Sequence, residues 1–293
     1  MTVRVATAQY EIGEPSDFDA FAARVAAQVG IAAGRGAQVV VLPEYLALEM
    51  AAMFDAAMRG DFMRSLAALQ AHHEAFLALA RELARTHAIH LVAGSFLVDV
   101  GGGRYRNRAY LVSPQGRVAY QDKLTLTGFE RAARVIDPGH ELKVFDTDFG
   151  RIAIDICYDI EFPLYARAQA EAGARLLLVP SCTDTAAGAN RVLVGCRARA
   201  LESPLSVACA VTAGEAPWSP ALDVNTGTAG VYSPIDRGFP DDGIVARAEN
   251  GWAIADLDLD AFTANAQHAQ VANARDWPAQ LRPKVRRARV ERI

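Results

Sequence analysis

A cysteine stands where a predicted buried strand gives way to a helix. The isoleucines between positions 152 and 156 alternate with period two, which is typical of a strand buried in a sheet. The alternation stops at Cys157, and Pro163 then begins a predicted helix over residues 164–172. A thiol at such a corner projects from the sheet edge among backbone N–H groups, which favour a thiolate and a developing oxyanion. Cys157 is therefore a candidate nucleophile, with a buried structural cysteine as the alternative.

Two other strand ends carry ionisable side chains. An apolar strand runs into Pro43 and Glu44, and the proline both ends the strand and fixes the direction in which the next side chain leaves. A later predicted strand ends at Lys123, and Glu130 follows it in a segment that we expect at the same rim. Taken singly, each of these residues could equally be a solvated loop residue.

Composition bounds the class of protein. The chain has 293 residues, of which 52% are hydrophobic and 22% charged, so a well-filled core is expected. A formal net charge of −4 argues against nucleic acid as the main partner. The apolar runs are too short to span a bilayer, and the N-terminus lacks the pattern of an export signal. We therefore expect a cytoplasmic protein that is not a membrane protein.

The cysteines and histidines do not indicate a metal site. The four cysteines contain no CxxC pair, and the histidine pairs at 72–73 and 87–90 lack metal-ligand spacing. We expect neither a metal nor a cofactor, and we expect the thiols to be reduced.

Strands and helices alternate along the chain, which predicts an α/β fold with helices covering its sheets. The predicted strands lie near residues 3–9, 37–42, 89–94, 106–112, 118–123, 152–156, 176–179, 205–211, 218–220, 227–232 and 252–257. The predicted helices lie near residues 18–33, 61–86, 164–172 and 190–201. No linker-like stretch interrupts this pattern, so we predict one domain over residues 1–265 and a tail over residues 266–293.

Residues 36–44 and 173–181 share one layout. In both, a glycine is followed by a short apolar strand, and a proline then precedes a polar residue, Glu44 or Ser181. This repetition predicts that Glu44 and Ser181 approach one cleft from opposite sides, with Cys157 between them. It also places Cys182 near the mouth of that cleft.

Together these segments resemble the Glu–Lys–Cys catalytic set of the nitrilase superfamily of carbon–nitrogen hydrolases. The matching motifs occur in the family's order and approximate spacing: Pro43-Glu44, Asp122-Lys123 with Glu130-Arg131, and Ile156-Cys157-Tyr158-Asp159 with Phe162-Pro163. Residues 179–185 match the family's segment after the nucleophile, and the resemblance extends from residue 6 to residue 257. It implies a nitrilase-like four-layer α-β-β-α sandwich of two mixed sheets, which usually forms a homodimer or a larger homo-oligomer.

The resemblance assigns catalytic roles that suit the chemistry of these side chains. Cys157 would attack the carbon of an amide or nitrile, and Glu44 would accept the thiol proton and pass it to the leaving nitrogen. Lys123 and the backbone N–H of Tyr158 would hold the tetrahedral oxyanion. Glu130 would position the substrate or the hydrolytic water.

The implied activity is hydrolysis of a non-peptide carbon–nitrogen bond in a small molecule, most readily a carboxamide, through a thioester. A nitrile, an N-carbamoyl compound, or acyl transfer to an amine remain alternatives, as does a scaffold of the same fold without turnover. Phe129, Ser181, Cys182 and Thr183 are candidate substrate-binding residues near the mouth.

Two positions depart from the family pattern. Asp155 lies inside the nucleophile strand, where an apolar residue is more usual, and a buried carboxylate without a partner is costly. We therefore expect Arg197 or Arg199 against it. Leu164 follows Pro163 where many members have an acid, so their substrate preference does not transfer.

The tail is basic in an otherwise acidic protein. Trp277 offers an aromatic anchor, and the basic residues that follow are Arg282, Lys284, Arg286, Arg287, Arg289 and Arg292. We expect this arm to lie over an acidic partner subunit of a homodimer or larger assembly. Nucleic-acid binding is the weaker alternative, because no aromatic platform accompanies the charge.

Overall fold

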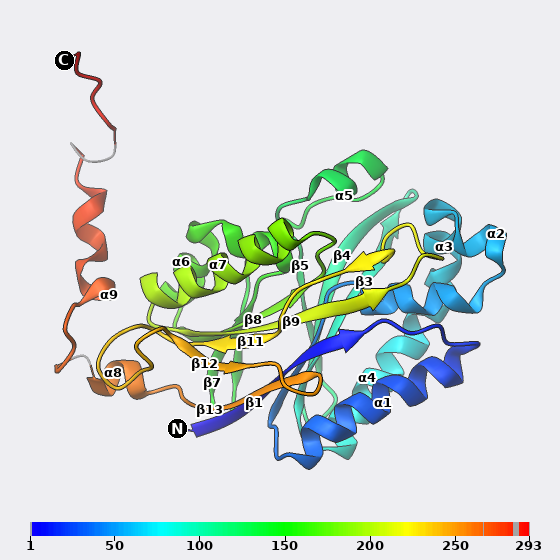
Figure 1. Ribbon diagram of the computed structural model, residues 1–293, viewed down its shortest axis with the longest axis horizontal. Coiled ribbons are helices and arrows are strands. Elements are labelled where there is room, and N and C mark those ends of the chain that lie inside the picture. The colour runs from blue at the N-terminus through cyan, green and yellow to red at the C-terminus, as the bar shows by residue number, and fades with distance from the viewer. Residues whose placement is uncertain (1, 266, 284–286, 293) are drawn as a thin grey trace.

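The computed structural model describes residues 2–265, 267–283 and 287–292. Two mixed β-sheets lie face to face, and a layer of helices covers the outer face of each (Figure 1). This arrangement confirms the α-β-β-α sandwich that the sequence predicts.

The first sheet is covered by α1 (Phe18–Gly34) and α4 (His73–Thr86). Its strands are β1 (Thr2–Glu11), β2 (Val39–Leu42), β3 (His90–Gly101), β4 (Arg104–Val112), β5 (Val118–Asp122) and β13 (Trp252–Asp258). The short elements between β2 and α4 are η1 (Leu46–Met53), α2 (Ala56–Arg59), α3 (Phe62–Leu69) and η2 (Gln70–His72). The strands β1, β2 and β3 are parallel, while β4, β5 and β13 run antiparallel to their neighbours.

The second sheet is covered by α6 (Pro163–Glu171) and α7 (Ala186–Glu202). Its strands are β6 (Val144–Thr147), β7 (Gly150–Ile154), β8 (Ala174–Ser181), β9 (Ser206–Glu215), β11 (Gly230–Tyr232) and β12 (Ile244–Arg247), and β10 (Val224–Asn225) pairs with the end of β9. The remaining elements are α5 (Gly128–Ala133), η3 (Cys157–Glu161), α8 (Ala261–Asn265), α9 (Asn273–Asp276) and η4 (Trp277–Leu281).

Strand β1 belongs to both sheets. Residues 5–7 pair with β2 in the first sheet, and residues 9–11 pair with β9 in the second. Alternate residues of β2 face opposite layers, because Val39 and Val41 pack between the sheets while Val40 and Leu42 pack under the helices. The apolar run is therefore buried on both faces, as its lack of polar residues predicts.

Several element boundaries differ from the sequence prediction. The helix predicted over residues 61–86 is interrupted at η2, where the Gln70 amide hydrogen-bonds to the backbone of β3 at Leu97 and Asp99. Residues 218–220 lie in a turn and not in a strand. Strands β6 and β12 were not predicted, because both are short and partly exposed and so lack a strong apolar pattern.

Gly94 lets β3 pass close beneath the end of β2. It has φ of +68°, lies at a register shift in β3, and a Cβ added there would be 2.3 Å from the carbonyl oxygen of Pro43. The next residue, Ser95, accepts a hydrogen bond from the N–H of Tyr45 at 2.9 Å. This bulge therefore supports the corner that carries Glu44.

Asp155 is buried, and neither expected arginine makes a direct ion pair with it, although the charge of Arg199 is near enough to act on its pKa. Its carboxyl accepts a hydrogen bond from the Gln169 amide of α6 at 2.9 Å. Arg199 instead donates to the Ile160 carbonyl and pairs with Glu202, while Arg197 donates to a backbone carbonyl. Burial raises the pKa of Asp155 to about 8, which favours the neutral acid at pH 7, and the Gln169 amide and the charge of Arg199 only partly oppose this shift.

The tail contacts the helical layer of the second sheet. The guanidinium of Arg167 lies over the ring of Trp277, 4.6 Å from its centroid, and Asn273 donates to the carbonyl of Leu201. Lys284 and Arg286 of the predicted basic arm, and Ala266 at its start, lie outside the described residues.

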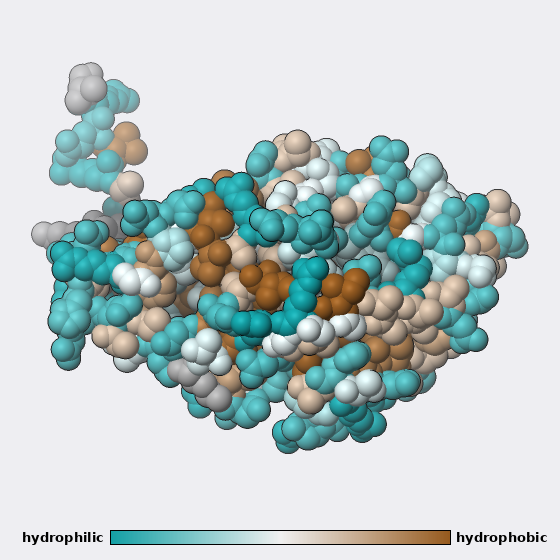
Figure 2. Space-filling model, turned by 60° about the horizontal axis from the view of Figure 1, so that its bottom comes forward, coloured by the Kyte–Doolittle hydropathy of each residue, from teal (hydrophilic) through white to brown (hydrophobic). Residues whose placement is uncertain are grey.

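The face of the molecule shown in Figure 2 is largely hydrophilic. With the lower side of Figure 1 turned forward, apolar residues form a brown band across the middle of that side, surrounded by hydrophilic residues (Figure 2). Apolar atoms are common on protein surfaces, so the band by itself identifies no partner.

Within residues 2–265, 267–283 and 287–292, no helix has the length and apolar character needed to cross a bilayer.

Replacing Asp155 by asparagine should change how stability depends on pH. Because the folded-state pKa is raised above its unfolded value, the wild-type carboxyl contributes stability that is lost as pH rises through about 8. Asparagine cannot ionise, so the melting temperature of D155N relative to wild type should rise between pH 5.5 and pH 8.5. The exposed Asp241→Asn is the control. If the difference in melting temperature between D155N and wild type stayed constant with pH, Asp155 would not be a buried acid with a raised pKa.

Candidate active site

Four ionisable or nucleophilic side chains meet at one end of the sandwich. Glu44 follows β2, Lys123 follows β5, Glu130 lies in α5, and Cys157 begins η3 after β7. Glu44 and Lys123 are each 1% exposed, and Cys157 is 4% exposed. Strand ends from both sheets therefore bring together the residues that the sequence singled out.

The ammonium of Lys123 lies between the two carboxylates. Its Nζ is 2.8 Å from Oε1 of Glu44, and 3.1 Å and 3.0 Å from Oε1 and Oε2 of Glu130. A buried charge is tolerated only when it is paired and hydrogen-bonded, and these contacts supply both conditions. The position of Lys123 is thus fixed by residues from separate segments.

Asn107 on β4 completes this network and was not identified from the sequence. Its amide nitrogen donates to Oε1 of Glu44 at 2.8 Å and to Oε1 of Glu130 at 3.1 Å. The signal available was an amide at a buried position of an alternating strand, between Tyr105 and Ala109. Such a residue requires a polar partner inside the protein.

Tyr45 is a second residue that sequence reasoning did not assign. Its hydroxyl donates to Oε1 of Glu130 at 2.7 Å, and its backbone is left-handed with φ of 61°. The residue directly after Glu44 therefore also contacts the second acid. The short turn ties the orientation of one carboxylate to the position of the other.

The local environments shift the pKa values of Glu44 and Glu130 in opposite directions. Burial raises the pKa of Glu44, although Lys123 opposes the shift. Burial also acts to raise the pKa of Glu130, but Lys123 and the N–H of Thr127 outweigh it and leave that pKa lowered. Burial would lower the pKa of Lys123, yet the two carboxylates hold it well above its usual range. Glu130 is thus the fixed anion, and Glu44 is the acid better suited to exchange a proton.

Cys157 occupies a strained corner. Its φ of 49° lies in the left-handed region, which is uncommon for a residue with a side chain. The sulfur lies 3.4 Å from the carbonyl oxygen of Cys182, to which the thiol donates. The chain thus makes the sharp strand-to-helix turn that the sequence predicts, and the turn presents the thiol to the acids.

Burial opposes the thiolate form of Cys157 that backbone N–H groups at such a corner favour. Burial and the nearby charge of Glu44 raise the pKa of Cys157 well above its usual value, and these effects exceed the opposing influence of Lys123 and Ser181. The group is therefore a thiol in the resting protein. A thiol beside a proton-accepting carboxylate can become a nucleophile as it transfers its proton.

Ser181 and Cys182 lie on the opposite side of the site from the first sheet. Ser181, at the end of β8, is fully buried, and its hydroxyl favours the thiolate form of Cys157. The backbone N–H of Cys182 donates to Oε2 of Glu44 at 3.0 Å. Glu44 and Ser181 thus approach Cys157 from different sheets, but they do not border one cleft as the repeated layout predicts, because only Glu44 lines the cavity that opens onto the thiol.

A cavity of about 290 Å³ opens onto Cys157, Lys123 and Glu44. Its walls include four of the predicted binding residues: Phe129, Tyr158, Cys182 and Thr183. Ser181 does not line this cavity and instead borders a neighbouring one of about 230 Å³. The cavity is large enough for a small substrate beside the thiol.

The mouth of this cavity carries charge of both signs. Glu161 and Arg191 form an ion pair at 3.2 Å, and Asp184 and Asp223 are exposed beside them. An exposed pair of this kind contributes little to stability. These side chains are therefore available to meet polar parts of a substrate.

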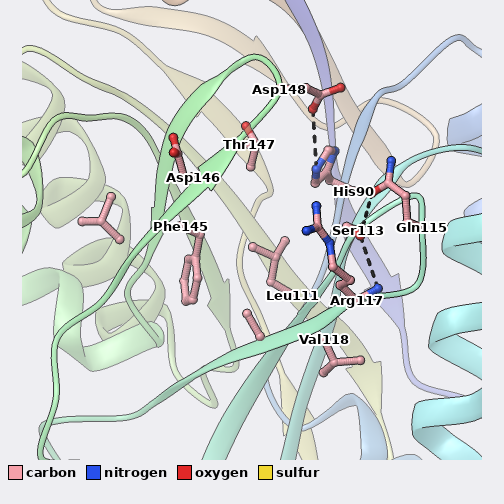
Figure 3. Close-up of a pocket in the computed structure, with 12 residues that line it drawn as sticks. His90, Leu111, Ser113, Gln115, Arg117, Val118, Phe145, Asp146, Thr147 and Asp148 are labelled. Atoms are coloured by element: carbon pink, nitrogen blue, oxygen red, sulfur yellow. Dashed lines mark hydrogen bonds and ion pairs between the residues drawn. The ribbon is translucent and has the colours of Figure 1, made fainter.

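A larger cavity of about 650 Å³ lies at the other end of the strands (Figure 3). It is bordered by the start of β3 at His90, by β5 at Val118, and by β6 around Phe145. His90 faces Asp148 at 3.7 Å, and burial lowers the pKa of His90. None of the four converging residues lines it, so its size does not make it the candidate active site.

The arrangement supplies a nucleophile, a proton acceptor and a cation at one point, which is what acyl transfer to a thiol requires. Among the residues that the structure describes, no group of three or more His, Cys, Asp or Glu side chains is placed to hold a metal ion.

Comparison with known proteins gives consistent relatives. The model of a family described as carbon-nitrogen hydrolase matches residues 4–260. The chain is 32% identical over 279 residues to the probable hydrolase YhcX of Bacillus subtilis, a match covering 94% of this chain and 53% of that protein. It is 29% identical over 185 residues to the omega-amidase NIT2 of Danio rerio, covering 60% and 63% respectively. The matched part is thus about half the length of the first relative and less than two thirds of the second.

Solved structures share the fold. Nit3 of Saccharomyces cerevisiae, a member of the nitrilase superfamily, aligns with a TM-score of 0.73 at 22% identity, covering 94% of this chain and 96% of that chain. An amidase from Nesterenkonia sp. aligns with a TM-score of 0.65 at 25% identity, covering 94% and 96%.

Proposed function

The chain belongs to the carbon–nitrogen hydrolase family, and on that premise we propose that it hydrolyses a small carboxamide through a thioester on Cys157. The observation that carries the proposal is the buried Lys123, held 2.8 Å from Glu44 in the cavity that opens onto the thiol. The names of the omega-amidase and amidase relatives support an amide as the substrate class.

The first half of the reaction forms the acyl-enzyme. As the sulfur of Cys157 attacks the amide carbon, its proton passes to Glu44, whose raised pKa suits it to hold that proton. The developing oxyanion is held by the ammonium of Lys123 and by the backbone N–H of Tyr158. Glu44 then protonates the leaving nitrogen, the C–N bond breaks, and ammonia or an amine departs.

The second half releases the acid. Water attacks the thioester carbon and gives a proton to Glu44, and the carbon–sulfur bond then breaks with return of that proton to the sulfur of Cys157. Glu130, held as an anion by Lys123, Tyr45 and Asn107, fixes Lys123 and positions the substrate or the water. A reducing compartment such as the cytoplasm suits this cycle, because it needs a free thiol.

Ammonia release provides the direct test. The wild-type protein should release ammonia from at least one member of a panel of small amides, nitriles and N-carbamoyl compounds. Cys157→Ala should abolish release while leaving the melting temperature close to wild type, because a small side chain replaces the thiol. Release from nitriles alone would change the substrate class. A folded wild-type protein with no fast-reacting cysteine and no turnover would indicate a scaffold.

The two acids should differ in the step that they affect. With a reactive amide, Glu44→Gln should form no thioester, because the proton acceptor is lost. Glu130→Gln should still form a thioester but hydrolyse it slowly. Intact-mass spectrometry separates these outcomes, and Cys157→Ala is the control for the site of addition. Accumulation of a thioester on E44Q but never on E130Q would reverse the two assignments.

We also propose that the protein acts as a homodimer or a larger homo-oligomer, with the tail contributing. Leu164 of α6 and Val194 of α7 are 72% and 64% exposed, and the ring of the tail residue Trp277 lies against Arg167 of α6. An apolar surface of this kind is stabilised when a second subunit covers it.

Removing the tail should weaken that assembly. A chain ending after Gln267 lacks Trp277 and the basic residues, so light scattering should give a lower mass than for the full chain at equal concentration. Trp277→Ala in the full chain tests the aromatic anchor separately. An unchanged mass for the shortened chain would mean that the arm is not needed for assembly.

A further inference from the structure

Asp159, two residues after the nucleophile, joins the two segments that carry Cys157 and Lys123. Its carboxylate is 1% exposed and accepts hydrogen bonds from the N–H of Thr125 at 2.7 Å and of Leu124 at 3.1 Å. It also accepts from the N–H of Ile156, directly before the cysteine, at 3.3 Å. One side chain therefore contacts the residues that follow the lysine and the residue that precedes the thiol.

We propose that Asp159 is a positioning residue that sets the ammonium of Lys123 relative to the sulfur of Cys157. The proposal rests on the function proposed above and deepens it, since it adds a residue that would act through Lys123 without contacting the substrate.

The topology explains why such a link is needed. Lys123 follows β5, the edge strand of the first sheet, and Cys157 follows β7 of the second sheet. The backbone of Lys123 is bonded to Asn107 of the first sheet and to Gly139 of the connecting segment. The hydrogen bonds from the N–H groups of Leu124 and Thr125 to Asp159 connect this segment to η3, which follows β7 of the second sheet. A hydrogen bond between the hydroxyls of Thr125 and Tyr165 adds a further contact across the same boundary.

The chemistry favours a carboxylate at this position. Three N–H donors converge on two oxygens, and an ionised carboxylate offers acceptors only. An asparagine side chain would turn its NH₂ group toward one of these donors and leave a buried N–H without an acceptor. Burial raises the pKa of Asp159 to about 7, and the N–H groups and Lys123 oppose that shift.

A purely structural role is the competing explanation, and Asp155 provides the matched control. It lies two residues before Cys157, is buried to the same extent, and bonds to Gln169 of α6 instead of the lysine segment. Both aspartates support the corner, but only the contacts of Asp159 described here extend to the residues after Lys123. A general loss of packing would affect both variants alike.

The experiment compares D159N and D155N with wild type below the unfolding temperature of each protein. The rate of iodoacetamide alkylation at Cys157 is measured as a function of pH by peptide mass mapping. The values of kcat and KM are measured at pH 8 on the amide that wild type hydrolyses best. For D159N we expect alkylation to require higher pH, since Lys123 favours the thiolate. We also expect kcat to fall about 10²-fold with KM changed only a few-fold, as for a displaced catalytic group. D155N should match wild type in both measurements.

Equal kcat and equal alkylation profiles for D159N and D155N would overturn the proposal. If D159N does not fold, Asp159→Glu replaces it, because the carboxylate is kept but displaced. A loss of at least about tenfold in kcat is then expected, and a wild-type kcat would refute the positioning role. If no amide is turned over by wild type, the proposed function fails, while the alkylation profiles still test the link between Asp159 and Lys123.

Discussion

The buried contact between Lys123 and two carboxylates is the constraint on which the rest of the site depends. Removing one ammonium and two carboxylates from water is costly, and the cost is offset only while Lys123, Glu44 and Glu130 keep their geometry. Asn107 and Tyr45 add hydrogen bonds to the Oε1 atoms of these carboxylates. The backbone N–H groups of Cys182 and Thr127 bind Oε2 of Glu44 and of Glu130, so residues from several segments hold one another in place. The same balance leaves the pKa of Glu44 raised and the pKa of Glu130 lowered.

Two residues with strained backbone conformations lie beside this network. Tyr45 and Cys157 both have left-handed backbones, and each lies just after a central strand, one in each sheet. Such conformations persist only where surrounding contacts impose them. At the first corner the bulge at Gly94 and the hydroxyl of Ser95 supply those contacts. The two corners bring an acid and a thiol together from opposite sheets.

Much of the fold follows from the sequence, because apolar periodicity and strand ends are local features. The same features place Glu44 and Cys157 at one rim. The partners of buried polar groups depend instead on which strands and helices become neighbours, so Asn107 was missed, as was Gln169 as the direct partner of Asp155. The thiol state of Cys157 was also beyond local sequence, since it arises from burial by distant segments.

Strand β1 lies beside β13, with Thr2 opposite Asp258. Both of these residues therefore lie at the end of the sandwich away from Cys157, because Glu44, Lys123 and Cys157 follow the carboxyl ends of strands that run in the same direction as β1. A further domain joined to the chain ahead of β1 would therefore be tethered behind the mouth of the cavity, so this architecture can carry such an addition without obstructing substrate entry.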